Sequence, residues 1–258
     1  MGQRHAANAR ALGHEVGVQD TDMDRRRQAS AGGYVLPADR WLTDVDAVVV
    51  ATPSSQHVEA MRDWCARPLL VEKPLAMSVA EVESLPRKPE YVWVGYNWRH
   101  HAEIVAARTR CSLPDRLTLG CDTRMAEWPG RAYESPVLEC SHEIDLLHWW
   151  RAPRRPRLAL ATMLSEHAMA LSYDTGDEVF LDWDAEPCRT VLVERGNSAE
   201  TFFPSLGVAL QQSYRYEMEA FLAWVGAGYR APAGCTLEDG LAVLRICEQA
   251  KAMAGVSA

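Results

Sequence analysis

The sequence predicts an α/β protein in two parts: a parallel-sheet domain over residues 1–89 and an α+β domain with a mostly antiparallel sheet over residues 90–258. The first part is predicted from the apolar, β-branched run at 46–51, which is typical of a strand buried on both faces of a parallel sheet. A helical segment and a second apolar run, 69–71, complete a βαβ unit. The second part is predicted from alternating strands after residue 115, with few helices among them.

The start of the chain lacks the first pieces of a dinucleotide-binding fold, which begins with a strand, then G-x-G-x-x-G, then a helix. The helix is predicted over 3–12 with Gly2 as the last glycine, and a strand over 15–18 leads to Asp20. About eight to ten residues, the first strand and two glycines, are missing. The first domain is therefore predicted to be a truncated Rossmann-like domain. Either Met1 is an internal methionine taken as the start, or the chain is a naturally degraded form.

The remaining elements follow from periodicity and capping signals, and prolines at 86 and 89 bracket the predicted domain boundary. Helices are predicted at 22–31, 56–66, 78–85, 102–110 and 141–151, followed by two amphipathic helices near the C-terminus, the second capped by Thr236. Strands are predicted at 33–35, 91–96, 116–125, 157–163, 168–173, 178–183 and 190–194.

Composition excludes several classes of protein. The 258 residues are 48% apolar and 24% charged, which is ordinary for a globular protein, and there is no apolar run long enough for a membrane span. The net charge of −8 argues against a nucleic-acid partner. The seven cysteines are scattered without a C-x-x-C pair, so neither a disulfide framework nor a zinc site is predicted. A reducing, cytoplasmic location is expected.

Two short polar segments follow the predicted parallel strands, Thr52-Pro53 and Glu72-Lys73-Pro74. Ligands of open α/β sheets bind beyond the carboxyl ends of the strands, where both segments fall. Lys73 could polarise or protonate a substrate oxygen there. The alternative is a surface lysine paired with Glu72.

Four segments, in this order, resemble the Gfo/Idh/MocA family of nicotinamide-dependent oxidoreductases: Gly2–Ala6, Glu72–Pro74, Val94–Arg99 and Ser141–Asp145. The resemblance extends over nearly the whole chain. It implies a dehydrogenase or reductase that uses NAD(P) and acts on a secondary alcohol or ketone of a sugar, a polyol or a sugar derivative. It also implies that Lys73 is catalytic.

The helix at 141–151 is the second candidate for chemistry. Ser141 can cap it, and His142, Asp145 and Trp149 share one face. The resemblance implies that His142 is an acid/base or a substrate ligand and that Asp145 orients it. The alternative is a histidine satisfied by a neighbouring carboxylate in the packing between domains.

This segment departs from the commonest family pattern, which has an aspartate and a glycine shortly before the histidine. Leu138 and Cys140 occupy those places, and Glu139 lies between them as a replacement for the aspartate. This form resembles a branch associated with surface-sugar biosynthesis. A metal site is not predicted, because one helix cannot direct Glu139, His142, Asp145 and His148 to one ion.

The predicted cofactor is NAD, because a carboxylate such as Asp20 accepts from the ribose 2′-hydroxyl and repels a 2′-phosphate. The arginines at 25–27 keep NADP as an alternative. The predicted cofactor contacts are Gly2, Asp20, Thr52, Pro53, His57, Glu72, Lys73 and Asn97. The resemblance implies that Asn97 faces the nicotinamide and that the substrate contacts are Lys73, Arg99 and His142. The alternative for Asn97 and Arg99 is that they are solvated residues at a strand end.

Two further expectations concern partners. The strands after residue 115 have few helices to cover both faces of their sheet, so a homodimer or homotetramer is expected. The rival to an enzyme is a non-catalytic binding or assembly protein that kept the fold and lost the dinucleotide site. The missing glycines favour this rival, and the intact Lys73 and His142 oppose it.

Overall fold

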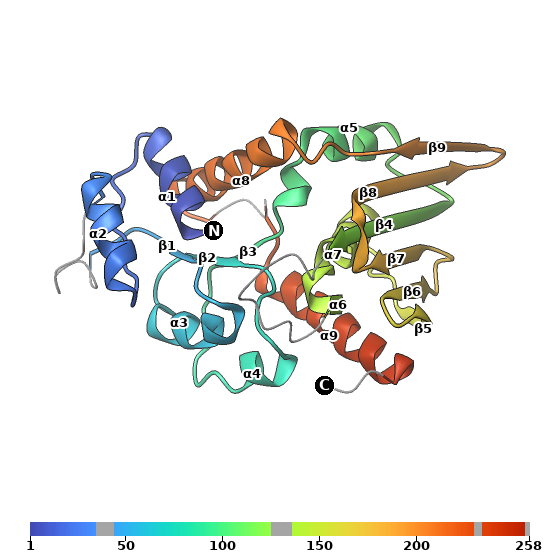
Figure 1. Ribbon diagram of the computed structural model, residues 1–258, viewed down its shortest axis with the longest axis horizontal. Helices are drawn as coiled ribbons and strands as arrows, with labels where there is room; N and C mark the ends of the chain where they lie inside the picture. Colours follow the sequence, from blue (N-terminus) through green and yellow to red (C-terminus); the bar gives the residue numbers. More distant parts are fainter. Residues whose placement is uncertain (35–43, 125–135, 230–233, 256–258) are drawn as a thin grey trace.

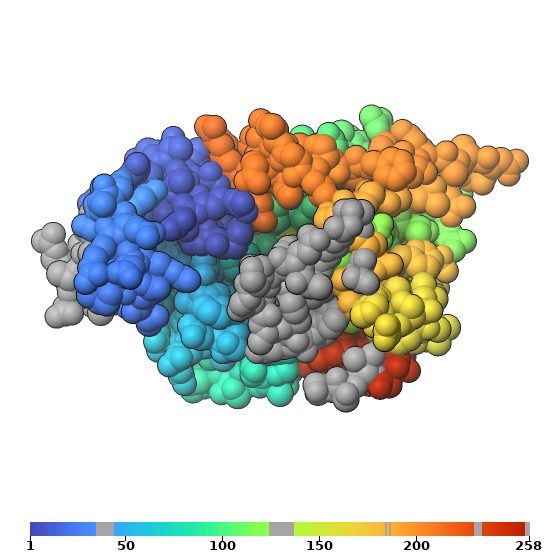
Figure 2. All heavy atoms as spheres, viewed as in Figure 1, coloured from blue at the N-terminus to red at the C-terminus, as the bar shows by residue number. Residues whose placement is uncertain are grey.

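The computed structural model of the chain describes residues 1–34, 44–124, 136–229 and 234–255. It contains two sheets, with helices between them and on the outer side of the smaller sheet (Figure 1). The N-terminal helices form one end of the molecule and the strands of the larger sheet the other (Figure 2). This confirms the predicted α/β class with one parallel and one mostly antiparallel sheet.

The smaller sheet has the order β1-β2-β3 and is parallel throughout. Its strands are β1 (Val48–Val50), β2 (Leu69–Glu72) and β3 (Val92–Gly95), and all residues of β2 and β3 are buried. The short helices η2 (Ser54–Gln56), α3 (His57–Asp63) and α4 (Val79–Glu83) connect the strands. The side chain of Ser78 caps α4 as predicted.

The strand pairing carries the smaller sheet past the predicted domain boundary at residue 89. β3 pairs with β2 from Leu69–Val92 to Glu72–Gly95, so a segment assigned to the second domain completes the first sheet. Prolines 86 and 89 mark a turn into this strand. The helix α8 (Val208–Gly226) also packs on this sheet, where Met218 and Phe221 form a cluster with Leu70 and Trp93.

The N-terminal region keeps its helices, α1 (Gly2–Ala11) and α2 (Met23–Ala31), the latter capped by Asp22. The strand predicted at 15–18 does not form; Gly17 makes one isolated bridge. The physical reason is that 15–18 is exposed or half-exposed on both faces and pairs with none of the described strands. The strand predicted at 33–35 is not formed at 33–34, and residue 35 lies outside the described residues.

The larger sheet has the order β5-β6-β7-β4-β8-β9, in which only the β4–β7 pair is parallel. Its strands are β4 (Arg116–Arg124), β5 (Leu158–Ser165), β6 (Ala168–Tyr173), β7 (Glu178–Asp182), β8 (Asp184–Arg195) and β9 (Ser198–Phe202). The edge strand β9 was not predicted, because its residues are nearly all exposed and lack an apolar alternation.

Helices cover one face of the larger sheet, on the side of the parallel sheet (Figure 1). They are α6 (Pro136–Glu139), α7 (Ser141–Arg151) and α9 (Leu237–Ala254). Between the two sheets in the sequence lie the short helix η3 (Asn97–His100) and the helix α5 (Ala102–Arg110). α7 has the predicted bounds, and Thr236 caps α9 in a capping box with Asp239. Leu117 and Leu119 of β4 share one core with Ile144 and Leu147 of α7.

Candidate active site

The turn after β2 brings Lys73 to the carboxyl edge of the parallel sheet. Its Nζ donates to Oε2 of Glu139 at 2.8 Å and to the Glu139 backbone oxygen at 2.9 Å. Both side chains are largely enclosed, at 17% and 20% exposure. The alternative pairing of Lys73 with the Glu72 side chain is therefore wrong: the ammonium is held by α6, from the second half of the chain.

Glu72 points the other way, toward α1. Its Oε1 lies 2.5 Å from Nε2 of His5, a histidine that is 2% exposed. Burial by itself raises the pKa of Glu72, but the His5 hydrogen bond and the nearby Lys73 charge outweigh it, and the pKa is lowered. Glu72 is thus an ionised carboxylate that belongs to the packing of α1 against the sheet.

His142 is the second residue of α7 and is almost fully buried. The rings of Tyr96 and Trp98 lie edge-on to it, with centroids 5.5 and 6.3 Å away. Burial, and secondarily the charge of Lys73, hold the pKa of His142 well below its usual range, so the imidazole is neutral at pH 7. Within the described part of the chain, its buried Nδ1 has no hydrogen-bond partner.

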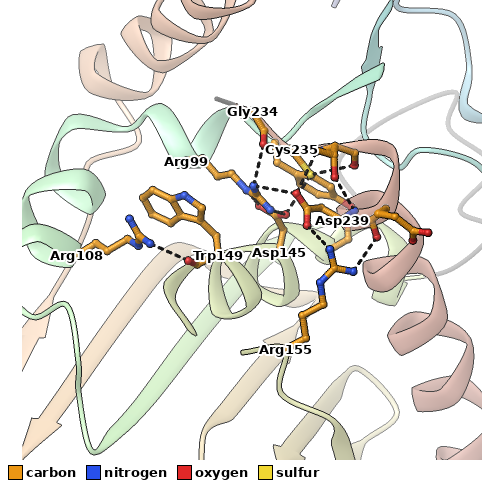
Figure 3. A network of polar contacts seen from close by, with 12 residues as sticks. Arg99, Arg108, Asp145, Trp149, Arg155, Gly234, Cys235 and Asp239 are labelled. Atoms are coloured by element: carbon orange, nitrogen blue, oxygen red, sulfur yellow. Dashed lines mark hydrogen bonds and ion pairs between the residues drawn. The ribbon is translucent and has the colours of Figure 1, made fainter. Parts of the chain in front are cut away.

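Asp145 has a different partner from the one predicted. Both of its oxygens accept from Arg99, from Nε at 2.8 Å and from Nη2 at 2.6 Å, and both residues are buried (Figure 3). The carboxylate therefore neutralises Arg99 and does not hold the His142 ring. The prediction failed because helix periodicity shows only that Asp145 and His142 lie on the same side of α7. It does not show that Arg99, from another element, packs against Asp145.

The Arg99–Asp145 pair belongs to a network that joins η3, α7 and α9 (Figure 3). Arg99 also lies 3.6 Å from Asp239, which binds Arg155 at 2.8 Å, and Asp145 accepts from the Cys235 thiol at 3.5 Å. The predicted role of Arg99 as a substrate contact does not fit this geometry, because its guanidinium is already bound to protein carboxylates.

The N-terminus of α1 lies at the same edge of the parallel sheet as Lys73. A Cβ on Gly2 would meet only the Ala51 Cβ, at 3.8 Å, so the first turn of α1 adjoins the end of β1. This turn has no acidic residue and no side-chain cap. Free N–H groups at a helix N-terminus suit a pyrophosphate, so this end of α1 fits the dinucleotide that the sequence predicts.

Two other predicted cofactor residues, His57 and Asp20, have different surroundings. His57 is buried, with Nδ1 at 2.8 Å from the Pro74 oxygen and Nε2 at 3.0 Å from the Thr52 oxygen. It therefore ties the ends of β1 and β2 together, and its ring nitrogens are not free for a ribose. Asp20, after the first helix, is half-buried, and its Oδ1 accepts from the Asp22 N–H at 2.9 Å.

Asn97 begins η3 and is buried beneath α8. Its Nδ2 donates to Oγ of Ser213 at 2.7 Å. Within the described residues, its buried Oδ1 has no partner. A ligand amide or hydroxyl could satisfy this oxygen, which keeps Asn97 as a candidate contact.

Sequence reasoning missed a second ion pair beside His142. Arg189 of β8 lies 2.8 Å from Oε1 of Glu143 and 5.2 Å over the Trp98 ring. An arginine in a strand and a glutamate in the first turn of a helix give no local signal of pairing. Tyr214 of α8 lies edge-on to His5, with the ring centroids 6.3 Å apart.

Glu217 of α8 is a fully buried carboxyl, and within the described structure neither of its oxygens has a partner. Burial, and then the charges of Glu72 and Asp145, raise its pKa well above the usual 4.5. A raised pKa means that folding favours the protonated form, so stability is present below about pH 4.5 and falls as the pH rises toward the folded pKa.

Ionisation of the buried Glu217 carboxyl is expected to lower the free energy of unfolding as the pH rises. Replacing Glu217 with glutamine should prevent this decrease, because an amide cannot ionise. The measurement is urea unfolding at pH 5 and pH 8. The wild type should lose free energy of unfolding between the two, and Glu217→Gln should lose less. Glu219→Gln, on the exposed side of the same helix, is the control. Identical pH dependence in all three proteins would contradict an ionisation at Glu217.

The described residues contain neither a metal site nor a membrane-spanning helix. No group of three or more His, Cys, Asp or Glu side chains is arranged to hold a metal ion. No helix in this part of the chain has the length and apolar character needed to cross a membrane.

The chain resembles known proteins in its sequence and in its fold. Residues 2–90 match the model of the Gfo/Idh/MocA oxidoreductase family with an NAD-binding Rossmann fold. The rhizopine catabolism protein MocA of Rhizobium meliloti is 27% identical over 244 residues, which cover 80% of this chain and 75% of MocA.

Solved structures share the fold along almost the whole chain. GenD2 from gentamicin A biosynthesis, in complex with NAD, has a TM-score of 0.80 at 19% identity and covers 99% of this chain and 91% of its own. A myo-inositol dehydrogenase of Corynebacterium glutamicum has a TM-score of 0.81 at 17% identity, covering 98% and 93%. UDP-N-acetylglucosamine 3-dehydrogenase GnnA of Acidithiobacillus ferrooxidans has a TM-score of 0.78 at 20% identity, covering 98% and 94%.

The family model identifies residues 2–90 as a Rossmann-type, NAD-binding domain of the oxidoreductase class. This first part of the chain matches the Gfo/Idh/MocA family, and the chain as a whole resembles MocA in sequence and GenD2 in fold.

Proposed function

We propose that this protein is an NAD-dependent dehydrogenase or reductase that acts on a secondary alcohol or ketone of a sugar, a polyol or a sugar derivative. The observation that carries the proposal is the placement of Lys73, held by Glu139, close enough to His142 for its charge to lower that histidine's pKa. The relatives support the substrate class, because they include a myo-inositol dehydrogenase and a dehydrogenase of a nucleotide sugar. A role in surface-sugar biosynthesis is part of this proposal, on the resemblance of the segment around Glu139 to that branch.

The residues divide the work of alcohol oxidation. The N-terminus of α1, Asp20 and Asn97 would hold the dinucleotide, which supplies the hydride acceptor when bound. The Lys73 ammonium binds the substrate oxygen, and the neutral His142 accepts the hydroxyl proton. In the reverse direction, the protonated imidazole returns that proton to the carbonyl oxygen.

Glu139 positions Lys73 in this scheme. A carboxylate and a backbone oxygen on one residue direct two of the three ammonium hydrogens, which leaves the third for the substrate oxygen. Glu139 thus takes the place of the aspartate in the commonest family pattern.

Charge balance in the site favours an uncharged substrate. Lys73 is paired with Glu139 and Arg189 with Glu143, while Glu72 is held by a hydrogen bond to His5. A substrate carboxylate or phosphate would have to displace one of these protein carboxylates from its cation, at a considerable cost in desolvated charge. A neutral polyol needs no such displacement, so we favour polyols and neutral sugars.

The test is an assay of nicotinamide reduction with a panel of inositols, neutral sugars and nucleotide sugars, run with NAD and with NADP. Turnover with NAD and a neutral polyol is expected, because Asp20 would repel a 2′-phosphate. Absence of turnover, together with absence of NAD binding by calorimetry, would favour the non-catalytic assembly protein instead.

The outer face of the larger sheet supports self-association. Phe180 and Leu160 are 37% and 56% exposed on this face, next to the small residues Gly120 and Ala170 on neighbouring strands. Among the described elements, the helices pack on the opposite face (Figure 1). We propose that two copies associate through these faces, giving a homodimer or a homotetramer.

Phe180→Asp is expected to shift the protein to monomer in sedimentation velocity at micromolar concentration, because it places two charges in a symmetric interface. Phe203→Asp, at an exposed phenylalanine outside this sheet, should leave the oligomer intact. A wild-type monomer under the same conditions would contradict the proposal.

The cysteines bear on location. We propose a cytoplasmic location, which the scattered spacing of the seven cysteines in the sequence favours.

A further inference from the structure

A buried histidine on α1 contacts the turn that carries Lys73. Nε2 of His5 lies 2.5 Å from Oε1 of Glu72, and the other Glu72 oxygen accepts from the Lys73 backbone N–H at 3.3 Å. Because Glu72 is ionised and can only accept, the His5 ring must donate. One carboxylate therefore joins α1 to the backbone of Lys73.

The packing leaves Glu72 little freedom to move. Gly95 lies opposite it in the β2–β3 register, and a Cβ there would meet the Glu72 Cα at 3.2 Å and its Cδ at 3.6 Å. On the other side, the Tyr214 ring lies edge-on to His5 at 6.3 Å, with the Arg4 guanidinium 4.4 Å from the centroid of that ring. The Glu72 side chain is therefore confined between Gly95 on one side and the rings of His5 and Tyr214 on the other.

We infer that His5 is a positioning residue for Lys73, acting through Glu72; the catalytic importance of this role rests on the proposed function. Glu72 is the last residue of β2 and faces His5 of α1, while Lys73 is the first residue of the bend that follows and faces Glu139. Fixing the first side chain fixes the backbone from which the second extends. The helix that fits the dinucleotide is thereby tied to the amine that acts on the substrate.

The lysine content of the chain allows a direct test without turnover. Lys73, Lys88 and Lys251 are its lysines, so protein labelled with ¹⁵N and ¹³C at lysine gives few signals to assign. The Lys73 ammonium, bound to Glu139, should show slow hydrogen exchange with water. In His5→Leu this exchange should be faster by about tenfold or more, the effect of losing a hydrogen bond to a charged group. The ¹³Cε signals of Lys88 and Lys251 should not move.

Two matched variants separate positioning from general packing. His5→Gln keeps an N–H donor near the Nε2 position, so it should restore slow exchange at Lys73. His167→Leu removes a histidine from an exposed His167–Glu166 pair, with 3.2 Å between Nε2 and Oε1, and should leave Lys73 unchanged. Folded His5→Leu protein with wild-type exchange at Lys73 would overturn the inference.

If His5→Leu does not fold, Glu72→Gln replaces it, because the amide keeps the shape and removes the charged acceptor. Fast Lys73 exchange in Glu72→Gln supports the inference, and unchanged exchange overturns it. These outcomes do not depend on activity, so a wild-type protein that turns over no substrate would defeat the proposed function while the exchange result still stands. In an active enzyme, His5→Leu should lower kcat with little change in KM, and His5→Gln should restore it.

Discussion

Replacing Lys73 with methionine is expected to lower kcat by roughly 10²–10⁴, the usual contribution of a positioned acid–base group. Methionine has a similar length and no ammonium, so the substrate oxygen loses its charged donor. Affinity for NAD should be nearly kept, since the proposed dinucleotide contacts lie on α1, on η3 and at Asp20, between α1 and α2. Steady-state kinetics and calorimetry measure the two quantities separately.

Variants of His142 and Glu139 test whether these two residues act together with Lys73 in catalysis. His142→Ala should also lower kcat, and the double variant should lose less than the sum of the two effects, because residues that act together fail together. Glu139→Gln should lower kcat while NAD binding is kept, since it weakens the charged partner of the ammonium. Near-normal turnover of Lys73→Met on the true substrate would show that the turn at residues 72–74 has a structural role and no catalytic one.

The second large effect is expected on stability. Asp145→Ala should lower the free energy of unfolding by about 3–5 kcal/mol, because it leaves the buried Arg99 guanidinium without its main counter-charge. Urea denaturation measures the loss. Asp174→Ala is the matched control: it removes an aspartate from an exposed pair with Arg157 and should leave stability nearly unchanged.

The same variant separates the two roles considered for Asp145. If Asp145 oriented His142, Asp145→Ala would remain stable and would lose kcat alone. The observed contacts predict the opposite order, with stability lost first and activity falling as the folded population falls. Unfolding and rate measurements on one preparation distinguish these cases.

The elements that the sequence predicted best have a strong local pattern. α5 and α7 have the predicted bounds, as does β6, because their apolar spacing matches one period throughout. Elements without such a pattern were missed or wrongly predicted: β9 is exposed, and residues 15–18 form one isolated bridge, at Gly17, and pair with none of the described strands. A strand is stabilised by its neighbours, and local sequence carries little information about them.

The sequence by itself determined the two sheet types, the edge at which Lys73 lies and the family that residues 2–90 match. Only the tertiary structure decided the partners of the charged residues: Lys73 with Glu139, Asp145 with Arg99, and Glu72 with His5, pairs that are 66, 46 and 67 residues apart. Periodicity shows which side chains share a face of an element, and a buried charge is stable only against an opposite charge that another element brings to that face. The choice of partner therefore depends on how distant elements pack, and local patterns in the chain do not record it.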